Sequence, residues 1–396
     1  MRILVINSGS SSIKFQLFDL DKKNRLASGI IEEVGGDSST ISLLTKEKIT
    51  KKTTIKNHEE GFLAMERALF ESGALNSLQE LDAIGHRVVH GGKSFSKPIL
   101  IDESVIERLK EISPLAPLHN PSHIVGIEIA IRQSKGVKQV AVFDTAFHKT
   151  IPNYAHTYAI PYELYEKMDV KKYGFHGTSH HYVSKEASKF LNIEYKNFNA
   201  ISLHLGNGAS ATAINNGKSV DTSMGLSPLE GLIMGTRSGD IDPAILFYLH
   251  KELNYGVKKF DELLNKQSGL RGICGKSDMR EVRQMAEDGN KKAILAIEMF
   301  AYRIKKYIGA YSAVLNRVDA LIFTGGIGEN DSDLRYKICN KLQILGIKID
   351  SIKNKSVQRG AICDISKDSQ GVKILVVPTD EELEIALETK RVVKYN

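Results

Sequence analysis

The fold is decided by residues 1–17, which read MRILVINSGSSSIKFQL. The apolar run at residues 3–6 predicts a buried strand, and residues 7–12 form a loop of small polar side chains. Apolar and polar residues then alternate over residues 13–17, which is the period of a half-buried strand. A turn and a further apolar stretch at residues 26–31 complete a predicted meander of three strands.

The same arrangement returns at residues 200–223. A predicted strand at residues 200–205 leads into the loop Gly-Asn-Gly-Ala-Ser, and an alternating stretch at residues 211–214 follows. The tripeptide Asn215-Asn216-Gly217 is a strong hairpin signal, and a third strand follows it. Two copies of strand, loop and hairpin with few matching residues predict a duplicated domain.

Helical and extended stretches alternate through the remaining sequence, which predicts an α/β architecture. Helices are expected at residues 59–71, 105–112, 123–133, 244–253, 281–287, 291–318 and 332–342, and strands at 83–89, 137–143, 320–324 and 373–377. We expect one domain at residues 1–149 plus 383–396 and the other at residues 150–382, with a central cleft between them.

Length and composition exclude several classes of protein. A chain of 396 residues suits two domains, and 42% hydrophobic with 26% charged residues is a globular balance that excludes disordered and fibrous proteins. The net charge of +7 comes from basic residues scattered in pairs, which favours a solvated surface over a nucleic-acid partner. A mildly basic surface also attracts anionic substrates.

Three cysteines, Cys274, Cys339 and Cys363, lie far apart without a CxxC pair. We therefore expect a reducing compartment, with neither a disulfide framework nor a thiolate metal site. The apolar start is too short for a signal peptide, and no segment approaches the roughly 18 apolar residues that span a bilayer. These features predict a soluble, cytoplasmic protein without a membrane partner.

Three loops rich in glycine or serine follow predicted strands, at residues 7–12, 206–210 and 325–330. Glycine lets the backbone approach a phosphate, and exposed N–H groups form an anion-binding concavity. One such loop is commonly an ordinary turn. Three at the carboxyl ends of strands favour a ligand, because open α/β sheets bind ligands at that edge.

Two familiar phosphate motifs do not fit these loops. Residues 206–211 match GxGxx(G/A), but a strand and a hairpin turn follow where the dinucleotide motif needs a helix. This argues against an NAD-dependent dehydrogenase. The Walker pattern around Gly92-Lys93-Ser94 would need a glycine where Arg87 stands, which argues against a P-loop enzyme.

Several charged residues have the surroundings of a phosphoryl-transfer site. Arg87 and Arg237 lie beside glycines, which suggests backbone crowded around a ligand, although surface arginines are the ordinary alternative. His176 and His180 have the spacing of a zinc helix, but HExxH lacks its glutamate here and Gly177 weakens a helix. A phosphate-binding histidine and a structural one both remain open.

Carboxylates at predicted strand ends suit Mg²⁺, which binds to one or two of them and keeps several waters. Asp144 follows one strand, and Glu381 and Glu382 follow another. Helix caps are the ordinary alternative for all three residues.

Five segments together resemble the acetate kinase family: residues 7–14, 174–180, 204–208, 234–242 and 324–330. The resemblance covers the chain from Asn7 to Glu382. It implies duplicated ribonuclease-H-like domains, as in actin, sugar kinases and heat-shock chaperones. It also implies direct in-line transfer of a phosphoryl group between ATP and acetate, giving acetyl phosphate and ADP, with Mg²⁺ or alternatively Mn²⁺, in a homodimer.

The resemblance also implies roles for individual residues. Asn7 and Glu381 hold the metal, and Arg87 holds the acyl carboxylate. Asp144 is the active-site acid or base, and His176 and Arg237 stabilise the transition state. The N-terminal domain is the acyl side and the C-terminal domain the nucleotide side. The small apolar pocket for the methyl group is made by Val89, Leu118, Phe175 and Pro228. Nucleotide contacts fall on Lys14, His204, Leu205, Gly206, Asn207, Gly208, Asp278, Met279, Arg280, Gly325, Gly326, Ile327, Gly328 and Glu329.

Two positions depart from the family pattern, since Cys274 stands in place of serine and Asp380 in place of asparagine. The role implied for Asp144 also needs a physical correction. A carboxylate substrate has a pKa of roughly 4–5 and is already a nucleophile at neutral pH, so it needs no general base. We expect Asp144 to act on the metal or to orient Arg87.

Other functions remain to be weighed. Propionate or butyrate kinase differs from acetate kinase by a methylene in an apolar pocket, which is worth only about 1–3 kcal/mol. An actin- or chaperone-like ATP-binding protein would need no anchors for a second substrate, so Arg87, His176 and Arg237 argue against it.

Overall fold

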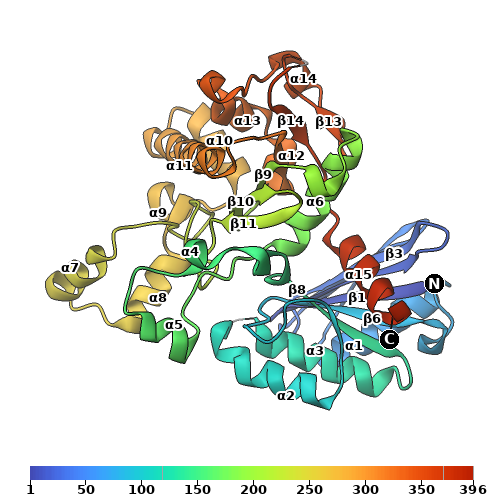
Figure 1. The fold of residues 1–396 in the computed structure, drawn as a ribbon. Coiled ribbons are helices and arrows are strands. Elements are labelled where there is room, and N and C mark those ends of the chain that lie inside the picture. Colours follow the sequence, from blue (N-terminus) through green and yellow to red (C-terminus); the bar gives the residue numbers. More distant parts are fainter. Residues whose placement is uncertain (118, 369, 396) are drawn as a thin grey trace. The chain divides into compact units, whose positions relative to one another are not determined.

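The structure is a computed structural model that describes residues 1–117, 119–368 and 370–395 (Figure 1). The chain divides into two compact units. The first unit is Met1–Phe147 with Asp380–Asn396, and the second is His148–Thr379. We expected the second domain at residues 150–382, and the second unit spans His148–Thr379. Each unit is built around its own β-sheet.

The sheet of the first unit starts from the predicted meander. Its strands β1 (Arg2–Ser8), β2 (Ser12–Asp19) and β3 (Asn24–Glu32) pair antiparallel. On the other side of β1, strands β6 (Ala83–Val88) and β8 (Lys138–Phe143) run parallel to it. Three further strands were not predicted; they are β4 (Ser39–Leu44) and β5 (Lys48–Thr53) at one edge and β7 (Ile99–Leu100) at the other.

Alternation along β1 places side chains on both faces of this sheet. Leu4 and Ile6 join the core on the face covered by α1 (His58–Glu71), whereas Ile3 and Val5 join the core on the face of α15 (Glu381–Tyr395). The remaining α-helices of the unit are α2 (Glu103–Ile112) and α3 (Asn120–Gln133). This layering explains why β1 reads as a continuous apolar run, since both of its faces are buried.

The sheet of the second unit has the same plan. Strands β9 (Ala200–Leu205), β10 (Ala209–Asn215) and β11 (Lys218–Thr222) form the second meander. Strands β12 (Ala320–Thr324) and β14 (Lys373–Val376) continue the sheet in parallel, and β13 (Cys363–Asp364) pairs antiparallel at its edge.

The duplication is confirmed by strand order and direction. The order β3-β2-β1-β6-β8 in one sheet corresponds to β11-β10-β9-β12-β14 in the other, with two antiparallel pairings followed by two parallel ones in each. The fold is therefore α/β, with a duplicated domain of the ribonuclease-H-like, actin-like type.

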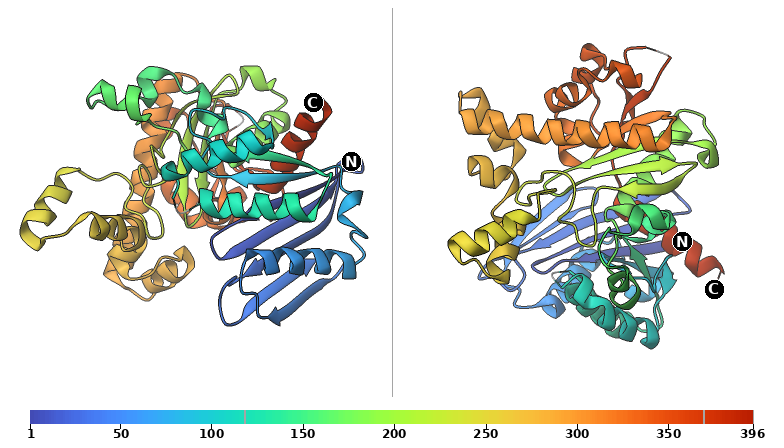
Figure 2. Two further views of the ribbon diagram at one scale, coloured as in Figure 1. Left: turned by 90° about the horizontal axis from the view of Figure 1, so that it is seen from below. Right: turned by 60° about the vertical axis from the view of Figure 1, so that its left-hand side comes forward.

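The helices of the second unit include one long element, α11 (Lys291–Leu315), which packs along β10 and β9. Figure 2 shows it in orange above the strands of that sheet. The others are α4 (Asn153–His156), α5 (Tyr162–Met168), α6 (Gly177–Phe190), α7 (Ala244–Leu253), α8 (Val257–Lys266), α9 (Gly269–Cys274), α10 (Met279–Glu287), α12 (Gly325–Asn330), α13 (Ser332–Cys339) and α14 (Ser351–Lys355).

Several local predictions were wrong, including the helix expected at residues 332–342, which ends at Cys339. Residues 177–190 form α6 despite Gly177, and residues 325–330 form the short helix α12 instead of an open loop. Helix α11 ends at Leu315 and not at residue 318, because Asn316 adopts the left-handed conformation that closes a helix.

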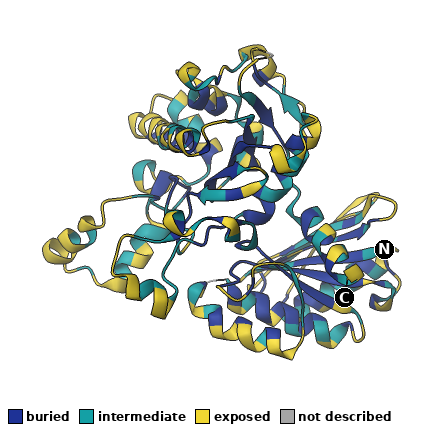
Figure 3. Cartoon of the chain, viewed as in Figure 1, coloured by how far each residue is buried: buried dark blue, intermediate teal, exposed yellow. Residues whose placement is uncertain are grey.

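Burial follows this plan. Figure 3 shows the central strands dark blue, while α7 and α8 are teal and yellow. In the parts of the chain that the structure describes, every helix is too short or too polar to cross a bilayer.

Candidate active site

The first unit places Arg87 and Asp144 side by side at the ends of two parallel strands. In the register of β6 and β8, Arg87 lies opposite Val142, and Asp144 directly follows β8. The Arg87 guanidinium donates from Nη2 to Asp144 Oδ2 at 2.6 Å, and from Nε to Oδ2 and Oδ1 at 3.1 and 3.2 Å. The side chain of Asp144 is 1% exposed and that of Arg87 is 21% exposed. The carboxylate of the pair is therefore buried, whereas part of the arginine side chain remains accessible.

Further carboxylates gather around this guanidinium. Burial alone would lower the pKa of Arg87, but the charges of Asp144, Glu381 and Glu382 raise it well above its usual value. Burial raises the pKa of Glu381, Arg87 opposes that shift, and Asp144 adds to it. Burial and the charge of Glu381 also raise the pKa of Glu382. Glu381 and Glu382 are therefore harder to ionise than ordinary glutamates, and their carboxyl oxygens are hard donors suited to a divalent cation.

Asn7 and Lys14 face each other across the first hairpin. The loop between them is closed by the Gly9 N–H, which donates to the Ser12 carbonyl at 2.8 Å. The charge of Lys14 opposes the rise that burial causes in the pKa of Glu381, and Lys14 lines a hollow of about 500 Å³ together with Glu382. The first unit thus brings the predicted metal ligand Asn7 onto the same sheet as Arg87.

In the second unit, His176 is positioned by an unusual backbone. It has φ of 56°, in the left-handed region, directly before α6. A Cβ at Gly174 would lie 2.4 Å from the Thr222 side chain and 2.7 Å from that of His148, so only glycine fits there. His148 Nε2 lies 2.9 Å from the Phe175 carbonyl. These contacts fix the backbone of Gly174 and Phe175, which directly precede His176.

Hydrogen bonds between histidines and serines surround His176. Its Nδ1 lies 2.9 Å from Ser210 Oγ, and His180 Nε2 lies 2.8 Å from the same hydroxyl. The ring of His204 lies 4.4 Å from that of His176, centroid to centroid, and its Nδ1 is 2.8 Å from Ser179 Oγ. His176 is therefore tied to β9 and β10, the strands that border the second Gly-rich loop.

Arg237 converges on the same loop. Its Nη1 donates to the Pro228 carbonyl at 3.1 Å. A Cβ at Gly208 would lie 3.6 Å from both Arg237 Nη1 and His176 Nε2, so both groups face this glycine. Burial lowers the pKa of Arg237, and within the described residues it forms no ion pair. A half-buried cation without a carboxylate partner is suited to bind an anion.

The other predicted nucleotide residues lie on this unit as well. Gly206 N–H donates to the Gly208 carbonyl at 3.0 Å, and the chain continues as a hairpin, as the sequence predicts. Glu329 Oε1 accepts from the backbone N–H groups of Gly325 at 3.0 Å and Thr379 at 3.2 Å. This carboxylate therefore holds α12 in place.

Asp278 accepts from the Arg280 backbone N–H at 2.8 Å and pairs with its guanidinium. This pairing lowers the pKa of Asp278 to about 2. Leu205 and Met279 are buried, so they present only backbone toward a ligand. Asn207 and Gly326 are exposed, and Ile327 and Gly328 complete α12.

The predicted acyl-pocket residues are divided between the units. Val89 is 8% exposed in the first unit, where its N–H donates to His123 Nδ1 at 3.3 Å. Phe175 is 2% exposed and Pro228 half-buried in the second unit. Leu118 lies outside the described residues.

Comparison with known proteins identifies the family. The model of the acetokinase family matches residues 2–387. The chain belongs to the acetokinase family. A relative named acetate kinase from Campylobacter concisus (strain 13826) is 58% identical over 398 residues, covering 100% of this chain and 99% of the relative.

Two solved structures of this family illustrate the likeness. Porphyromonas gingivalis acetate kinase superposes with a TM-score of 0.94 at 43% identity. A propionate kinase from Francisella tularensis subsp. tularensis SCHU S4 superposes with a TM-score of 0.93 at 46% identity. Each comparison covers 99% of both chains. Acetate kinases of this family use ATP or ADP as a substrate.

One departure from the acetokinase pattern is compensated locally. Asp380, where we expected asparagine, accepts from Arg25 Nη2 at 2.6 Å and from the Leu383 N–H at 3.0 Å at the start of α15. Its extra charge is therefore paired.

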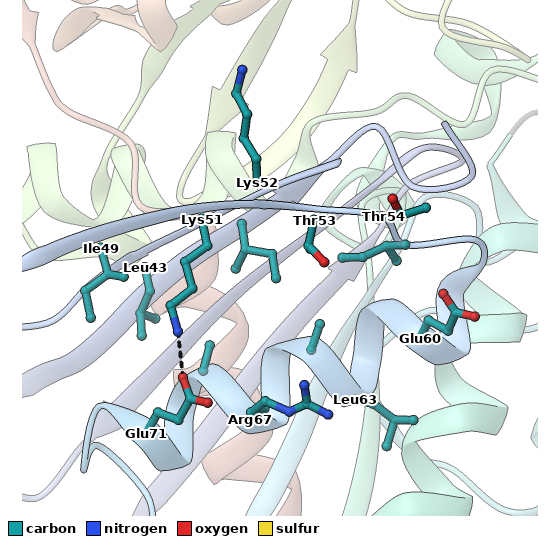
Figure 4. Close-up of a pocket in the computed structure, with 14 residues that line it drawn as sticks. Leu43, Ile49, Lys51, Lys52, Thr53, Thr54, Glu60, Leu63, Arg67 and Glu71 are labelled. Carbon is teal, nitrogen blue, oxygen red and sulfur yellow. Dashed lines mark hydrogen bonds and ion pairs between the residues drawn. The ribbon is translucent and has the colours of Figure 1, made fainter. Parts of the chain in front are cut away.

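A hollow of about 450 Å³ is lined by residues of β4, β5 and α1 in the first unit. Figure 4 shows the residues that line it. Its walls mix apolar side chains with charged and hydroxyl-bearing ones, and Lys51 Nζ is neutralised by Glu71 at 2.8 Å. Of the residues that the structure describes, none of those predicted for the acetokinase site lines it. A well-formed hollow is thus not by itself the reaction site.

The sequence missed Ser179 and Ser202 as parts of the site, and it included Ser210 only as the last residue of the loop at residues 206–210. The only signal was their pattern, because Ser202 and His204 alternate along one strand and Ser210 follows the Gly-rich loop on the next. These hydroxyls reach the histidines only because α6 packs on this sheet, and the sequence does not show that packing. Their hydrogen bonds therefore could not be predicted.

Proposed function

We propose that this chain catalyses the reversible transfer of the γ-phosphoryl group of ATP to acetate, giving ADP and acetyl phosphate. The observation that carries the proposal is full-length similarity at 58% identity to an acetate kinase. The anchors that distinguish a kinase from a plain ATP-binding protein are all present, namely Arg87, His176 and Arg237.

The proposed role of Arg87 is to bind the carboxylate of acetate. Asp144 occupies its Nε and Nη2 groups, while Nη1 makes no hydrogen bond within the described residues. A guanidinium held in this way offers a fixed donor for a second carboxylate. Because acetate is ionised at neutral pH, it attacks the γ-phosphorus directly and Asp144 need not remove a proton.

The proposed role of Arg237 and His176 is to stabilise the transferring group. In phosphoryl transfer, negative charge spreads over three equatorial oxygens, and the protein contributes mainly positioning and positive charge. Arg237 supplies an unpaired cation beside Gly208, and His176 supplies a ring nitrogen at the same place. In-line attack and departure need no further covalent step.

We propose Asn7 and Glu381 as the residues that hold Mg²⁺, with Mn²⁺ as an alternative. The raised pKa of Glu381, among the carboxylates of Asp144 and Glu382, fits this assignment, because a bound cation would favour the ionised form. When bound, the ion would neutralise charge on the phosphates. Lys14 lies on the same sheet and is proposed for the ATP phosphates.

The proposed nucleotide site combines the loop at Gly206, Asn207 and Gly208 with α12 and the start of α10. Glycines there let backbone N–H groups approach phosphate oxygens. Leu205, Met279 and Ile327 then contribute backbone or apolar contact, whereas Glu329 acts by holding α12. His204 and the residues Asp278 and Arg280 complete this proposed site.

Propionate is the competing acyl substrate, because a propionate kinase structure is 46% identical to this chain. We propose that Val89, Leu118, Phe175 and Pro228 contact the acyl methyl group. An additional methylene there is worth about 1–3 kcal/mol, or roughly 10- to 200-fold in kcat/KM. We expect acetate to be preferred by an amount within this range.

The test is hydroxylamine trapping of acyl phosphate, with acetate, propionate and butyrate compared at equal concentrations. We expect ATP consumption to depend on the acid, with the highest kcat/KM for acetate. A higher value for propionate would reassign the substrate. ATP hydrolysis that is indifferent to all three acids would instead support a chaperone-like ATPase.

We propose a homodimer that buries an apolar face of the second unit. All of α7 is exposed or half-exposed, including Phe247 at 75% and Tyr248 at 64%. Helix α11 exposes Leu295 at 52% and Tyr302 at 66%. Large apolar side chains left exposed on an isolated chain are typical of an interface, and a second copy of the chain is the commonest occupant. The cytoplasmic location stays a prediction.

A further inference from the structure

An unbroken chain of hydrogen bonds runs from the core of the second unit to His176. Ser202 Oγ on β9 lies 2.9 Å from His180 Nδ1, and His180 Nε2 lies 2.8 Å from Ser210 Oγ on β10. Ser210 Oγ in turn lies 2.9 Å from His176 Nδ1. Ser202, Ser210 and His180 are each 0% exposed, so water cannot complete their hydrogen bonding.

The hydrogen bonds in this series could be donated in more than one direction. Counting the hydrogens that each group has to donate shows which direction is possible. Each serine has one hydroxyl hydrogen, and a neutral imidazole has one N–H and one acceptor nitrogen. Within the described residues, Ser202 bonds through its side chain to His180 alone, and Ser210 to His180 and His176 alone. Both serine hydrogens must therefore be donated along the chain, because a buried donor without an acceptor costs about 1–3 kcal/mol.

Only one direction satisfies every group. Ser202 donates to His180 Nδ1, His180 Nε2–H donates to Ser210, and Ser210 donates to His176 Nδ1. In the reverse direction the hydroxyl hydrogen of Ser202 has no acceptor. If both histidines donate to Ser210, the hydrogen of Ser210 has none.

We infer that Ser202, His180 and Ser210 fix His176 as the tautomer that carries its proton on Nε2. The inference rests on the proposed function, in which His176 donates to an oxygen of the transferring phosphoryl group. A proton on Nε2 faces Gly208, where Arg237 Nη1 also lies. Ser210 and His180 are thus positioning residues that act through His176.

The same series of hydrogen bonds opposes a second protonation of the His176 ring. A doubly protonated ring would carry N–H at Nδ1 and force the unfavourable direction on Ser210. Arg237, His204 and His180 are titratable or charged groups among the described residues of this unit that lie close to His176. Arg237 adds repulsion, and burial keeps the pKa of His180 well below its usual range. A neutral imidazole then donates without competing for a proton, as in enzymes that use neutral histidine as an electrophile.

The direct test is NMR of the full-length protein labelled with ¹⁵N-histidine, without substrates. The His176 signals are assigned from a His176→Gln variant. We expect an unprotonated Nδ1 and a protonated Nε2 that persist from pH 8 to pH 6. A protonated Nδ1, whether as the other tautomer or as the imidazolium at neutral pH, would overturn the inference.

A variant series adds a functional readout. Ser210→Ala removes the donor to His176 Nδ1, so we expect a mixture of tautomers and a fall in kcat of about tenfold, with KM for ATP and acetate little changed. Ser210→Thr, which keeps a hydroxyl, should restore both. Ser184→Ala is the matched control, because Ser184 is a fully buried serine of α6 that bonds to the His181 carbonyl and to Tyr195.

The outcomes separate this inference from the proposed function. A Ser210→Ala protein that keeps the wild-type tautomer and kcat would overturn the inference. If Ser210→Thr fails to fold, the wild-type spectrum still decides the tautomer. If the chain phosphorylates none of the acids, the proposed function fails, while the tautomer measured without substrate is unaffected.

Discussion

The guanidinium of Arg87 and the carboxylate of Asp144 are joined by three hydrogen bonds, the shortest 2.6 Å from Nη2 to Oδ2. The arrangement uses Nε and Nη2 of the arginine and leaves Nη1 without a partner in the described residues. The carboxylate therefore orients the arginine, and it is 1% exposed, which leaves it poorly placed to exchange protons with solvent. This geometry supports an orienting role over that of a general base.

Replacing Asp144 by asparagine tests that role. Asp144→Asn keeps the shape but removes the charge that holds Arg87 and contributes to the carboxylate cluster. We expect KM for acetate and the Mg²⁺ concentration for half-maximal rate each to rise about tenfold, because a charge-assisted pair contributes about 1.5–3 kcal/mol. Initial rates measured over a matrix of acetate and Mg²⁺ concentrations provide the check.

Glu71→Gln is the control for that experiment. Glu71 is a carboxylate of the same unit that pairs with Lys51 at 2.8 Å, away from the carboxylates around Arg87, so its loss should leave the Mg²⁺ requirement unchanged. A fall in kcat of Asp144→Asn by 100-fold or more, with unaltered Mg²⁺ dependence, would instead indicate general-base catalysis.

Arg237 is expected to contribute mainly to the transition state. Arg237→Ala removes a half-buried cation that has no carboxylate partner among the described residues, so the folded state should lose little stability. We expect kcat to fall about 10³-fold with little change in KM, as for other arginines that stabilise phosphoryl transfer. Steady-state kinetics beside Arg271→Ala, an exposed arginine of α9, would show the difference. A loss of only a few-fold would remove Arg237 from the mechanism.

The sequence predicted the fold where local pattern and tertiary structure agree. Both meanders were found because alternation and the turn at Asn216 and Gly217 act within a few residues. Helix α6 was missed because it begins at Gly177 after a left-handed His176, a conformation fixed by contacts with distant Thr222 and His148. Helix propensity carries no information on such contacts.

For the site as well, some features could be predicted from the local sequence and others could not. The sequence identified Arg87 and Arg237 as candidates because each is an arginine with glycines nearby, a pattern that can be seen in the local sequence. The pairing of Arg87 with Asp144 depends on β6 lying beside β8, and the serine partners of His176 depend on α6 packing on β9. Such relations come from topology, so motifs alone could not supply them.

Buried histidines should make stability depend on pH. Burial lowers the pKa of His86 to about 4, while its Nε2 lies 2.8 Å from Gln139 Oε1. In the unfolded chain a histidine binds its proton below about 6.5, so the unfolded state takes up more protons as pH falls. The contribution of neutral His86 to the stability of the folded state is fully present above pH 6.5 and is lost progressively down to about pH 4. For His86 it amounts to about 3 kcal/mol, at roughly 1.4 kcal/mol for each unit of pKa.

Urea midpoints measured between pH 7.5 and pH 4.5 test this dependence. We expect them to fall with pH in the wild type and less steeply in His86→Asn. His250→Asn serves as the control, because His250 is exposed on α7. Equal slopes for wild type and His86→Asn would show that His86 is not held neutral.

The exposed face of α7 leads to a prediction about assembly. Phe247 is 75% exposed, although a phenylalanine of this kind is normally buried in a core or an interface. Phe247→Glu would place a charge in the proposed dimer contact. We expect the dimer dissociation constant to rise about 100-fold, since a central aromatic anchor contributes about 2–4 kcal/mol. Sedimentation equilibrium over a range of protein concentrations gives this constant.

Ile344→Glu separates an interface from a general effect of surface charge. Ile344 is 94% exposed in the same unit but lies outside α7 and α11, so its replacement should leave the dimer intact. Because His176 and Arg237 lie on elements other than α7, the Phe247→Glu monomer should retain activity. A wild-type chain that sediments as a monomer, or a Phe247→Glu chain that remains dimeric, would show that the apolar surface of α7 has another purpose.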